Sequence, residues 1–153
     1  MSEERVSEDR LPKQQARGLY ALIIQTPRTQ LLRVGRLGPQ LMPAGVYVYV
    51  GSAMGRGPQS LRGRIRRHLS VHKRTRWHID AVLAAPHVSI KSIIFAEARS
   101  HLECQLVHQL ELGPSARMPA PGLGASDCRE GCRSHLLLLE NLDVKEVEQA
   151  VSM

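Results

Sequence analysis

Apolar runs separated by glycine and proline divide the chain into short predicted elements. The clearest is residues 46–50, Val-Tyr-Val-Tyr-Val, in which β-branched and aromatic residues follow one another until Gly51. Residues 18–25 form a second apolar run, and residues 31–34 follow after a short turn, so this pair predicts a hairpin. Strands are expected at residues 18–25, 31–34, 46–50, 88–96 and 136–140.

Helical periodicity is strongest in the basic segment 61–69. Leu61, Ile65 and Leu69 recur at i, i+4 and i+8, which places them on one apolar face of a cationic helix. Pro58 suits the first turn of this helix. Further helices are predicted at residues 77–85, 101–112 and 144–151.

The order of these elements predicts the fold class. Three strands are followed by two helices, a strand and a helix, which favours an α/β (α+β) sandwich with a small, mainly antiparallel central sheet flanked by helices. We expect one domain over residues 18–140, after a mobile N-terminal tail at 1–17 and before a C-terminal helix or tail at 141–153.

Charge is divided unevenly along the 153 residues. Residues 10–79 contain fourteen lysines and arginines and no acidic residue, whereas residues 80–153 contain ten acids and six bases, and the net charge is +7. A cationic surface of this kind attracts polyanions. We therefore expect a nucleic-acid partner, DNA in the first place with RNA still allowed. A solubilising role and an anionic membrane surface are the alternatives.

The sequence carries no sign of export or membrane insertion. No apolar run approaches the roughly 18 to 20 residues of a membrane span, and the acidic N-terminus is unlike a signal peptide. We expect a cytoplasmic protein, associated with the nucleoid if it is bacterial, with no membrane partner. Cys104, Cys128 and Cys132 are too few for a disulfide framework and predict reduced thiols or a metal site.

Three polar side chains on the predicted helices are placed where chemistry is possible. Arg64 and His68 are four residues apart and share one face beside the apolar stripe of the basic helix. Glu103 falls on the apolar face of the helix predicted at 101–112. Because burying an unpaired carboxylate is costly, Glu103 needs a cation, which is either an arginine such as Arg64 or a metal ion.

Basic side chains on and after the cationic helix are candidates for contact with nucleic acid. Arg62, Arg66 and Arg67 are expected to project into solvent, where they contact phosphates or are simply solvated. His78 and Asp80 line a nucleic-acid groove or, equally, belong to a capped helix packed on the core. The predicted nucleic-acid contacts are Arg62, Arg66, Arg67, Lys73, Arg74 and Arg76.

Four short motifs, in this order, resemble the GIY-YIG nuclease superfamily. Residues 18–20 (Gly-Leu-Tyr) and 49–51 (Tyr-Val-Gly) match the two tyrosine motifs, 60–68 matches the basic helix, and 102–107 matches the helix that carries a glutamate. The resemblance covers about residues 18–112. Members of this superfamily cut DNA in excision repair, restriction, junction resolution and intron homing.

A narrower resemblance follows from residues 78–80 and 126–136, which look like a small branch of the superfamily found alone or fused to an endonuclease III-type base-excision enzyme. The resemblance implies a metal-dependent DNA endonuclease that hydrolyses phosphodiester bonds, with structure-selective cutting linked to DNA repair as the expected form. Two other functions stay open: a catalytically inactive nucleic-acid-binding module, and an adaptor that binds an acidic protein partner.

The resemblance also implies roles for individual residues. Tyr20, Tyr49, Arg64 and Glu103 would converge beside the scissile phosphate, and Glu103 would hold one Mg²⁺ or Mn²⁺ ion. Tyr20 or His68 would take the proton of the attacking water, Arg64 would stabilise charge on phosphorus, and Tyr49 would orient Tyr20 or the phosphate. Since a free tyrosine titrates near about 10, Tyr20 would need local cations such as Arg64 and the metal to lower its pKa before it could act as the base.

The cysteines allow two interpretations. Cys128, Cys132 and His135 have a spacing compatible with three zinc ligands, and Cys104 or Asp127 would be the fourth. A single loose triplet is a weak signal, however, and free cysteines are commonly small buried apolar residues, which is the interpretation that the spacing favours.

Overall fold

The structure is a computed structural model that describes residues 11–71, 75–100, 102–112, 116–125, 128, 130–140 and 144–152. Lys73 and Arg74, two of the predicted nucleic-acid contacts, lie outside these residues, as does Asp127. Among the helices that the structure describes, none has the length together with the apolar composition that crossing a bilayer requires.

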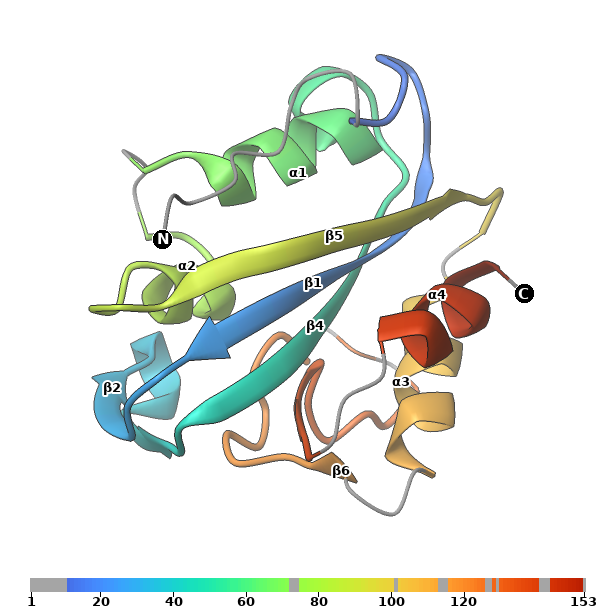
Figure 1. The fold of residues 1–153 in the computed structure, drawn as a ribbon. Coiled ribbons are helices and arrows are strands. Elements are labelled where there is room, and N and C mark those ends of the chain that lie inside the picture. The colour runs from blue at the N-terminus through green and yellow to red at the C-terminus, as the bar shows by residue number, and fades with distance from the viewer. Residues whose placement is uncertain are drawn as a thin grey trace.

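A five-stranded antiparallel sheet forms the centre of the fold (Figure 1). β1 and β4 are its longest pair, with Gly18 opposite Ala53 at one end and Thr26 opposite Gly45 at the other. β7 pairs with residues 47–49 of β4 on one side and with β6 on the other. The predicted α+β architecture is thereby confirmed. In spatial order the strands are β5 (Ser89–Glu97), β1 (Gly18–Thr26), β4 (Gly45–Ala53), β7 (Leu136–Leu139) and β6 (Ala116–Arg117).

A separate two-stranded sheet consists of β2 (Gln30–Arg33) and β3 (Pro39–Met42). The predicted hairpin between residues 18–25 and 31–34 is therefore wrong. β1 pairs instead with β4 and β5, which flank it along nearly its whole length, so neither of its edges is open to β2. The turn between β2 and β3 contains Gly38 at a φ of 71°, a left-handed conformation that favours glycine.

Helices cover both faces of the sheet (Figure 1), and each face has its own apolar core. Alternate residues of β1 point to opposite faces, so that Tyr20 and Ile24 pack toward α1 and α2, whereas Leu19 and Ile23 pack toward α3 and α4. This double burial explains the unbroken apolar run of β1. The helices are α1 (Leu61–Leu69), α2 (His78–Leu83), α3 (Glu103–Glu111) and α4 (Val144–Ser152).

Both ends of the described chain pack against the domain. Residues 11–17, expected to belong to a mobile tail, lie against α1, where the backbone N–H of Leu61 donates to the carbonyl of Ala16 at 3.0 Å. The tail prediction is thus wrong for this segment, because Ala16 is buried in the core. At the other end, Val147 and Val151 of α4 are buried in the core on the α3 face.

Element boundaries differ from the predicted ones at two places near the cationic helix. β4 continues through Gly51 to Ala53, because its pairing with the start of β1 continues there. Pro58 lies in a 3₁₀ turn, Gly57–Gln59, rather than in the first turn of α1. The helix begins after Ser60, whose side chain accepts a hydrogen bond from the backbone N–H of Gly63 at 3.1 Å.

Candidate functional site

Two tyrosines and a histidine from three elements form an aromatic cluster on the α1 face of the sheet. Tyr20 lies on β1, Tyr49 on β4 and His68 in the last turn of α1. The Tyr20 hydroxyl is 2.7 Å from Nε2 of His68. The ring centroids of Tyr20 and Tyr49 are 6.5 Å apart, and those of Tyr49 and His68 are 6.0 Å apart. Three predicted site residues therefore meet, and all three are buried.

Gly51 makes room for the Tyr20 side chain. The two residues are opposite each other in the β1–β4 register. A Cβ atom at Gly51 would lie 2.5 Å from the hydroxyl oxygen and from Cζ of Tyr20, which is closer than side-chain atoms approach one another. The glycine of the second tyrosine motif is thus needed for Tyr20 to reach across β4 toward His68.

Arg64 lies one turn before His68 on α1, beside the same cluster. Its Nη1 donates to the carbonyl of Ser52 at 3.0 Å, and its Nη2 donates to Oε1 of Gln59 at 3.1 Å, so the alternative pairing with Glu103 is not used. Its Nε is buried and has no hydrogen-bond partner among the residues that the structure describes. An N–H donor in this situation suits an incoming anion.

Burial sets the protonation of the two phenols. It raises the pKa of Tyr20 well above its ordinary value, and Tyr49 adds to the rise while Arg64 acts against it. Burial likewise raises the pKa of Tyr49 to about 12. Arg64 lowers the pKa of Tyr20, as expected, but the loss of solvent raises it more, so that the protein's own groups shift it upward. At neutral pH the Tyr20 hydroxyl keeps its proton, and Nε2 of His68 is the acceptor within reach in the tautomer that carries its proton on Nδ1.

Arg67 and Asp80 join α1 to α2. Two hydrogen bonds of 2.8 Å link the guanidinium to the carboxylate, which is 1% exposed and also accepts from the backbone N–H groups of Arg76 and Trp77. Burial alone would raise the pKa of Asp80, but these hydrogen bonds hold it below its ordinary value. The expectation that Arg67 projects into solvent is wrong, and the capped-helix interpretation of Asp80 is confirmed.

The other predicted nucleic-acid contacts differ in exposure. Arg66 and Arg76 have exposed side chains near the end of α1 and the start of α2. Arg62 does not project freely as expected, because its Nη1 donates to the carbonyl of Pro12 at 3.2 Å. The Trp77 ring centre lies 5.9 Å from that of His68, and the Arg64 guanidinium lies 5.2 Å from the Trp77 ring centre.

Glu103 is the first residue of α3 and is half-buried. Burial is the main cause of the raised pKa of Tyr49, and the negative charge of the Glu103 carboxylate adds a smaller rise. It also opposes the fall that burial causes in the pKa of His135. The carboxylate is thus within electrostatic range of both rings, near the start of β7. The predicted apolar face of its helix is confirmed by the burial of Leu106 and Val107.

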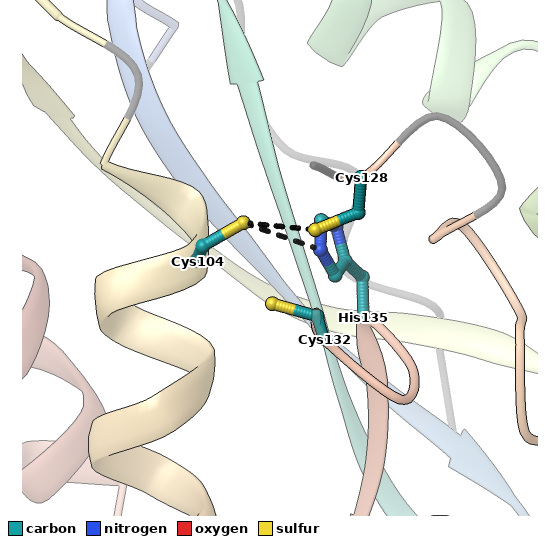
Figure 2. Close-up of side chains that lie close together, drawn as sticks. All are labelled: Cys104, Cys128, Cys132 and His135. Atoms are coloured by element: carbon teal, nitrogen blue, oxygen red, sulfur yellow. Dashed lines mark hydrogen bonds between the residues drawn. The ribbon is translucent and has the colours of Figure 1, made fainter. Parts of the chain in front are cut away.

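A second cluster brings together three cysteines and a histidine (Figure 2). Sγ of Cys104, Cys128 and Cys132 and a ring nitrogen of His135 all lie within 4.8 Å of one another. Cys104 Sγ is 3.3 Å from Cys128 Sγ and 3.8 Å from Nε2 of His135. Cys104 therefore takes the fourth position, and the four residues form a Cys₃His cluster of the kind that binds metal ions.

The protonation of this cluster reflects crowding and burial. Burial, reinforced by the neighbouring thiols, raises the pKa of Cys104, and burial raises the pKa of Cys132 to about 11. Burial would also raise the pKa of Cys128, but backbone hydrogen bonds lower it below its ordinary value. Burial lowers the pKa of His135, which keeps the ring neutral at pH 7, the form that binds a metal.

Gly124 links the two clusters, and the sequence patterns did not single it out. A Cβ atom there would lie 3.1 Å from the Tyr49 ring and 3.3 Å from Cβ of His135, so the loop passes between these two side chains with little spare room. The backbone N–H of Gly124 donates to Nδ1 of His78 at 3.1 Å. A glycine between two distant polar clusters has no local signal, because its neighbours come from the tertiary fold.

Comparison with known proteins places the chain in a family without assigning it an activity. No curated protein and no solved structure matches it. A family model described as "Domain of unknown function DUF123" matches residues 19–153, a range that includes every residue of both clusters. The chain belongs to the DUF123 family.

Proposed function

We propose that this protein is a metal-dependent phosphodiesterase that cleaves nucleic acid, in the first place DNA. The observation that carries the proposal is the pair of Tyr20 and His68, joined at 2.7 Å beside the guanidinium of Arg64. A proton acceptor, a hydroxyl and a cation at one point are the groups that phosphodiester hydrolysis requires. The resemblance of the same residues to GIY-YIG nucleases supports the same function independently of the geometry.

The raised pKa of Tyr20 decides how this pair would work. A phenol that keeps its proton at neutral pH is a poor base by itself, but it can pass a proton on. The attacking water would give its proton to the Tyr20 oxygen while the Tyr20 proton moves to Nε2 of His68. The new bond forms between the water oxygen and phosphorus, and the bond to the leaving alkoxide breaks. The buried Nε of Arg64 would donate to a phosphate oxygen as negative charge accumulates there.

Glu103 would hold the divalent ion. A single half-buried carboxylate fits Mg²⁺ or Mn²⁺, which keep several water ligands and need only one or two carboxylates from the protein. Bound there, the ion would supply Lewis-acid stabilisation of charge on the phosphate. The effect of Glu103 on the pKa of Tyr49 supports a position of this carboxylate within electrostatic range of the aromatic cluster.

Charge supports nucleic acid as the substrate. Residues 10–79, which supply Tyr20, Arg64 and His68, contain no acidic side chain. Arg66 and Arg76 are exposed and would contact the phosphate backbone on either side of the scissile bond. With these contacts, affinity depends on salt and little on base sequence.

The decisive experiment is a cleavage assay on labelled duplex, nicked, flap and branched DNA and on RNA, with Mg²⁺, Mn²⁺ or a chelator. Metal-dependent cutting that is lost in Tyr20→Phe and Glu103→Gln, with binding retained, supports the enzyme, and the preferred substrate shows whether cutting is structure-selective. Salt-sensitive binding without cutting would identify a binding module instead. No affinity for any of these polynucleotides would favour an adaptor for an acidic protein.

We also propose that the Cys₃His cluster binds one Zn²⁺ ion. Tetrahedral zinc with thiolate and imidazole ligands places neighbouring ligand atoms about 3.5 to 3.8 Å apart, close to the 3.3 and 3.8 Å separations around Cys104. Three sulfur ligands favour zinc over the oxygen-seeking Mg²⁺. The site would be structural, because its four positions are filled by protein.

Zinc analysis of the purified protein, together with the absorption of Co²⁺-substituted protein, tests this second proposal. We expect one zinc per chain and a thiolate-to-cobalt charge-transfer band, both lost in Cys128→Ala. His87→Asn is the matched control, because His87 is an exposed histidine that does not belong to the cluster. Absence of zinc and of the cobalt band from the wild-type protein would overturn the proposal.

A further inference from the structure

The Cys₃His cluster is built from the residues next to two of the candidate catalytic residues. Cys104 directly follows Glu103 in the first turn of α3. His135 directly precedes Leu136, which is the β7 partner of Tyr49, and the carbonyl of His135 accepts a hydrogen bond from the backbone N–H of Val50 at 3.0 Å. One ligand is thus fixed to the Glu103 helix and another to the Tyr49 strand.

The first turn of α3 has no side-chain cap, and Leu102 before it packs against the core. Leu102 occupies the N-cap position and offers no side-chain acceptor for the N–H groups of that turn. The buried side chains Leu106 and Val107 anchor α3 from its second turn, and Cys104 is the buried side chain nearest Glu103 in the helix. The position of the Glu103 backbone therefore depends on what holds the sulfur of Cys104.

At the other end of the cluster, His135 and the loop around Gly124 connect the cluster to Tyr49. The His135 backbone N–H donates to the carbonyl of Leu123 at 2.9 Å, which fixes the loop to the cluster. Gly124 then fills the space between the His135 side chain and the Tyr49 ring. A displacement of the His135 side chain would therefore move Gly124, and with it the Tyr49 ring that packs against Gly124.

We propose that the metal-loaded Cys₃His cluster is a clamp that positions Glu103 relative to Tyr49, so that its occupancy sets the affinity of the catalytic divalent-ion site. This inference rests on the proposed function. Cys104, Cys128, Cys132 and His135 are in this account positioning residues rather than catalytic ones. Removing the zinc frees the first turn of α3 and the 120–125 loop together, while α1 with Arg64 and His68 keeps its place against the other face of the sheet.

The test compares Mn²⁺ binding, measured by electron paramagnetic resonance, in the zinc-loaded protein and after removal of zinc. Cys128→Ala is the most informative variant, because Cys128 supplies a ligand from the loop and adjoins neither catalytic residue. We expect it to weaken Mn²⁺ binding by about 10- to 100-fold, the range seen when groups that orient metal ligands are removed. Cys128→His, which keeps four ligands, should restore zinc and Mn²⁺ affinity, and DNA affinity should not change in either variant.

Hydrogen exchange supplies a readout that does not depend on activity. On zinc removal from the wild-type protein by a chelator, the hydrogen-bonded amides 106 and 107 of α3 and 122–125 of the loop should exchange faster, while amides 64–69 of α1 stay protected. Refilling with Cd²⁺ should reverse the change. This measurement also serves if Cys128→Ala does not fold, because it needs no variant.

The outcomes separate the clamp from the proposed function. If Mn²⁺ binding is lost in Glu103→Gln but does not change when zinc is removed, the clamp is overturned and the proposed function is not. If Glu103→Gln leaves Mn²⁺ binding unchanged, the catalytic assignment of Glu103 fails, and the clamp, which acts on the ion through Glu103, fails with it. Exchange that is unaltered by zinc, or that rises equally in α1 and α3, also overturns the clamp.

Discussion

The hydroxyl of Tyr20 lies 2.7 Å from Nε2 of His68, although 48 positions separate the two residues in the chain. Both side chains are nearly inaccessible, at 1% and 3% exposure. Their contact joins β1 to the cationic helix, and it places a protonated phenol against an imidazole that can accept its proton. The proposed chemistry depends on this pair, and the stability of the α1 face depends on the Arg67–Asp80 pair beside it.

Replacing Tyr20 with phenylalanine removes one oxygen from the centre of the site and keeps the ring. We expect cleavage to fall by about 10² to 10⁴-fold, the usual worth of a positioned proton-transfer group, with DNA affinity unchanged. Tyr47→Phe is the matched control, because Tyr47 is a buried tyrosine of β4 whose hydroxyl donates to the Pro43 carbonyl away from the cluster. Equal activity losses in the two variants, measured under single-turnover conditions, would contradict a specific role for Tyr20.

Replacing Arg64 with lysine keeps the charge and removes the forked donor. We expect cleavage to fall by about 10² to 10³-fold, as when one donor to a developing oxyanion is lost, while the melting temperature changes little. Arg28→Lys, at an exposed position on the turn after β1, should alter neither quantity. If Arg64→Lys lowered the melting temperature strongly, the loss of activity would follow from loss of the folded protein. Arg64 would then be only a structural partner of Ser52 and Gln59.

All three tyrosines of the chain should resist ionisation. Burial raises the pKa of Tyr47 and of Tyr49 to about 12, and that of Tyr20 well above its ordinary value. Absorbance at 295 nm should therefore show almost no tyrosinate at pH 10, where a free tyrosine is about half ionised.

The same shifts predict how stability depends on alkaline pH. A pKa that is raised in the folded state contributes stability that is fully present below the unfolded value of about 10 and is lost as the pH rises through the folded value. Urea denaturation should thus give a constant free energy of unfolding from these groups up to about pH 9 and a decrease from about pH 10 upward. A titration with one proton released near pH 10 per tyrosine would contradict the burial of the cluster.

Replacing Asp80 with asparagine breaks a buried ion pair. We expect the free energy of unfolding at pH 7 to fall by about 3 to 5 kcal/mol, because the Arg67 guanidinium loses its partner. Glu140→Gln is the control, since it removes an exposed pair with Arg117 and should cost at most about 1 kcal/mol.

The contribution of Asp80 should also vanish in acid. Its folded pKa lies below the ordinary value, so its stabilising effect is present above about pH 4 and is lost as the pH falls through the lowered value. The difference between wild type and Asp80→Asn in urea denaturation should accordingly shrink between pH 5 and pH 2. A difference that stays constant down to pH 2 would show that Asp80 acts through its shape rather than its charge.

Much of the fold could be predicted because it is encoded in local patterns. The apolar run of β1, the alternation of β4 and the stripe of Leu61 and Ile65 on α1 each depend on a few neighbouring residues. The pairing of β2 could not, because partner choice depends on which edges of β1 are already occupied, and β4 and β5 occupy both.

The residues of the candidate site also fall into two groups, those that local motifs identify and those that only the tertiary fold brings together. Tyr20, Tyr49, Arg64 and His68 lie in short motifs that can be recognised by spacing, and the structure brings them together. The Arg67–Asp80 pair, 13 residues apart, and the link of Cys104 to His135, 31 residues apart, arise from the packing of separate elements. The net rise that burial causes in the pKa of Tyr20 could not be predicted for the same reason, since the depth of burial depends on how α1 covers the sheet.

The most direct test of the central claim is the single-turnover cleavage rate of wild type and Glu103→Gln on the same bound, end-labelled DNA with and without Mg²⁺. The account predicts that both proteins bind with equal affinity, that only wild type cleaves, and that it does so only with the metal. Equal rates for the two proteins, or binding by wild type with no cleavage of any substrate, would contradict it.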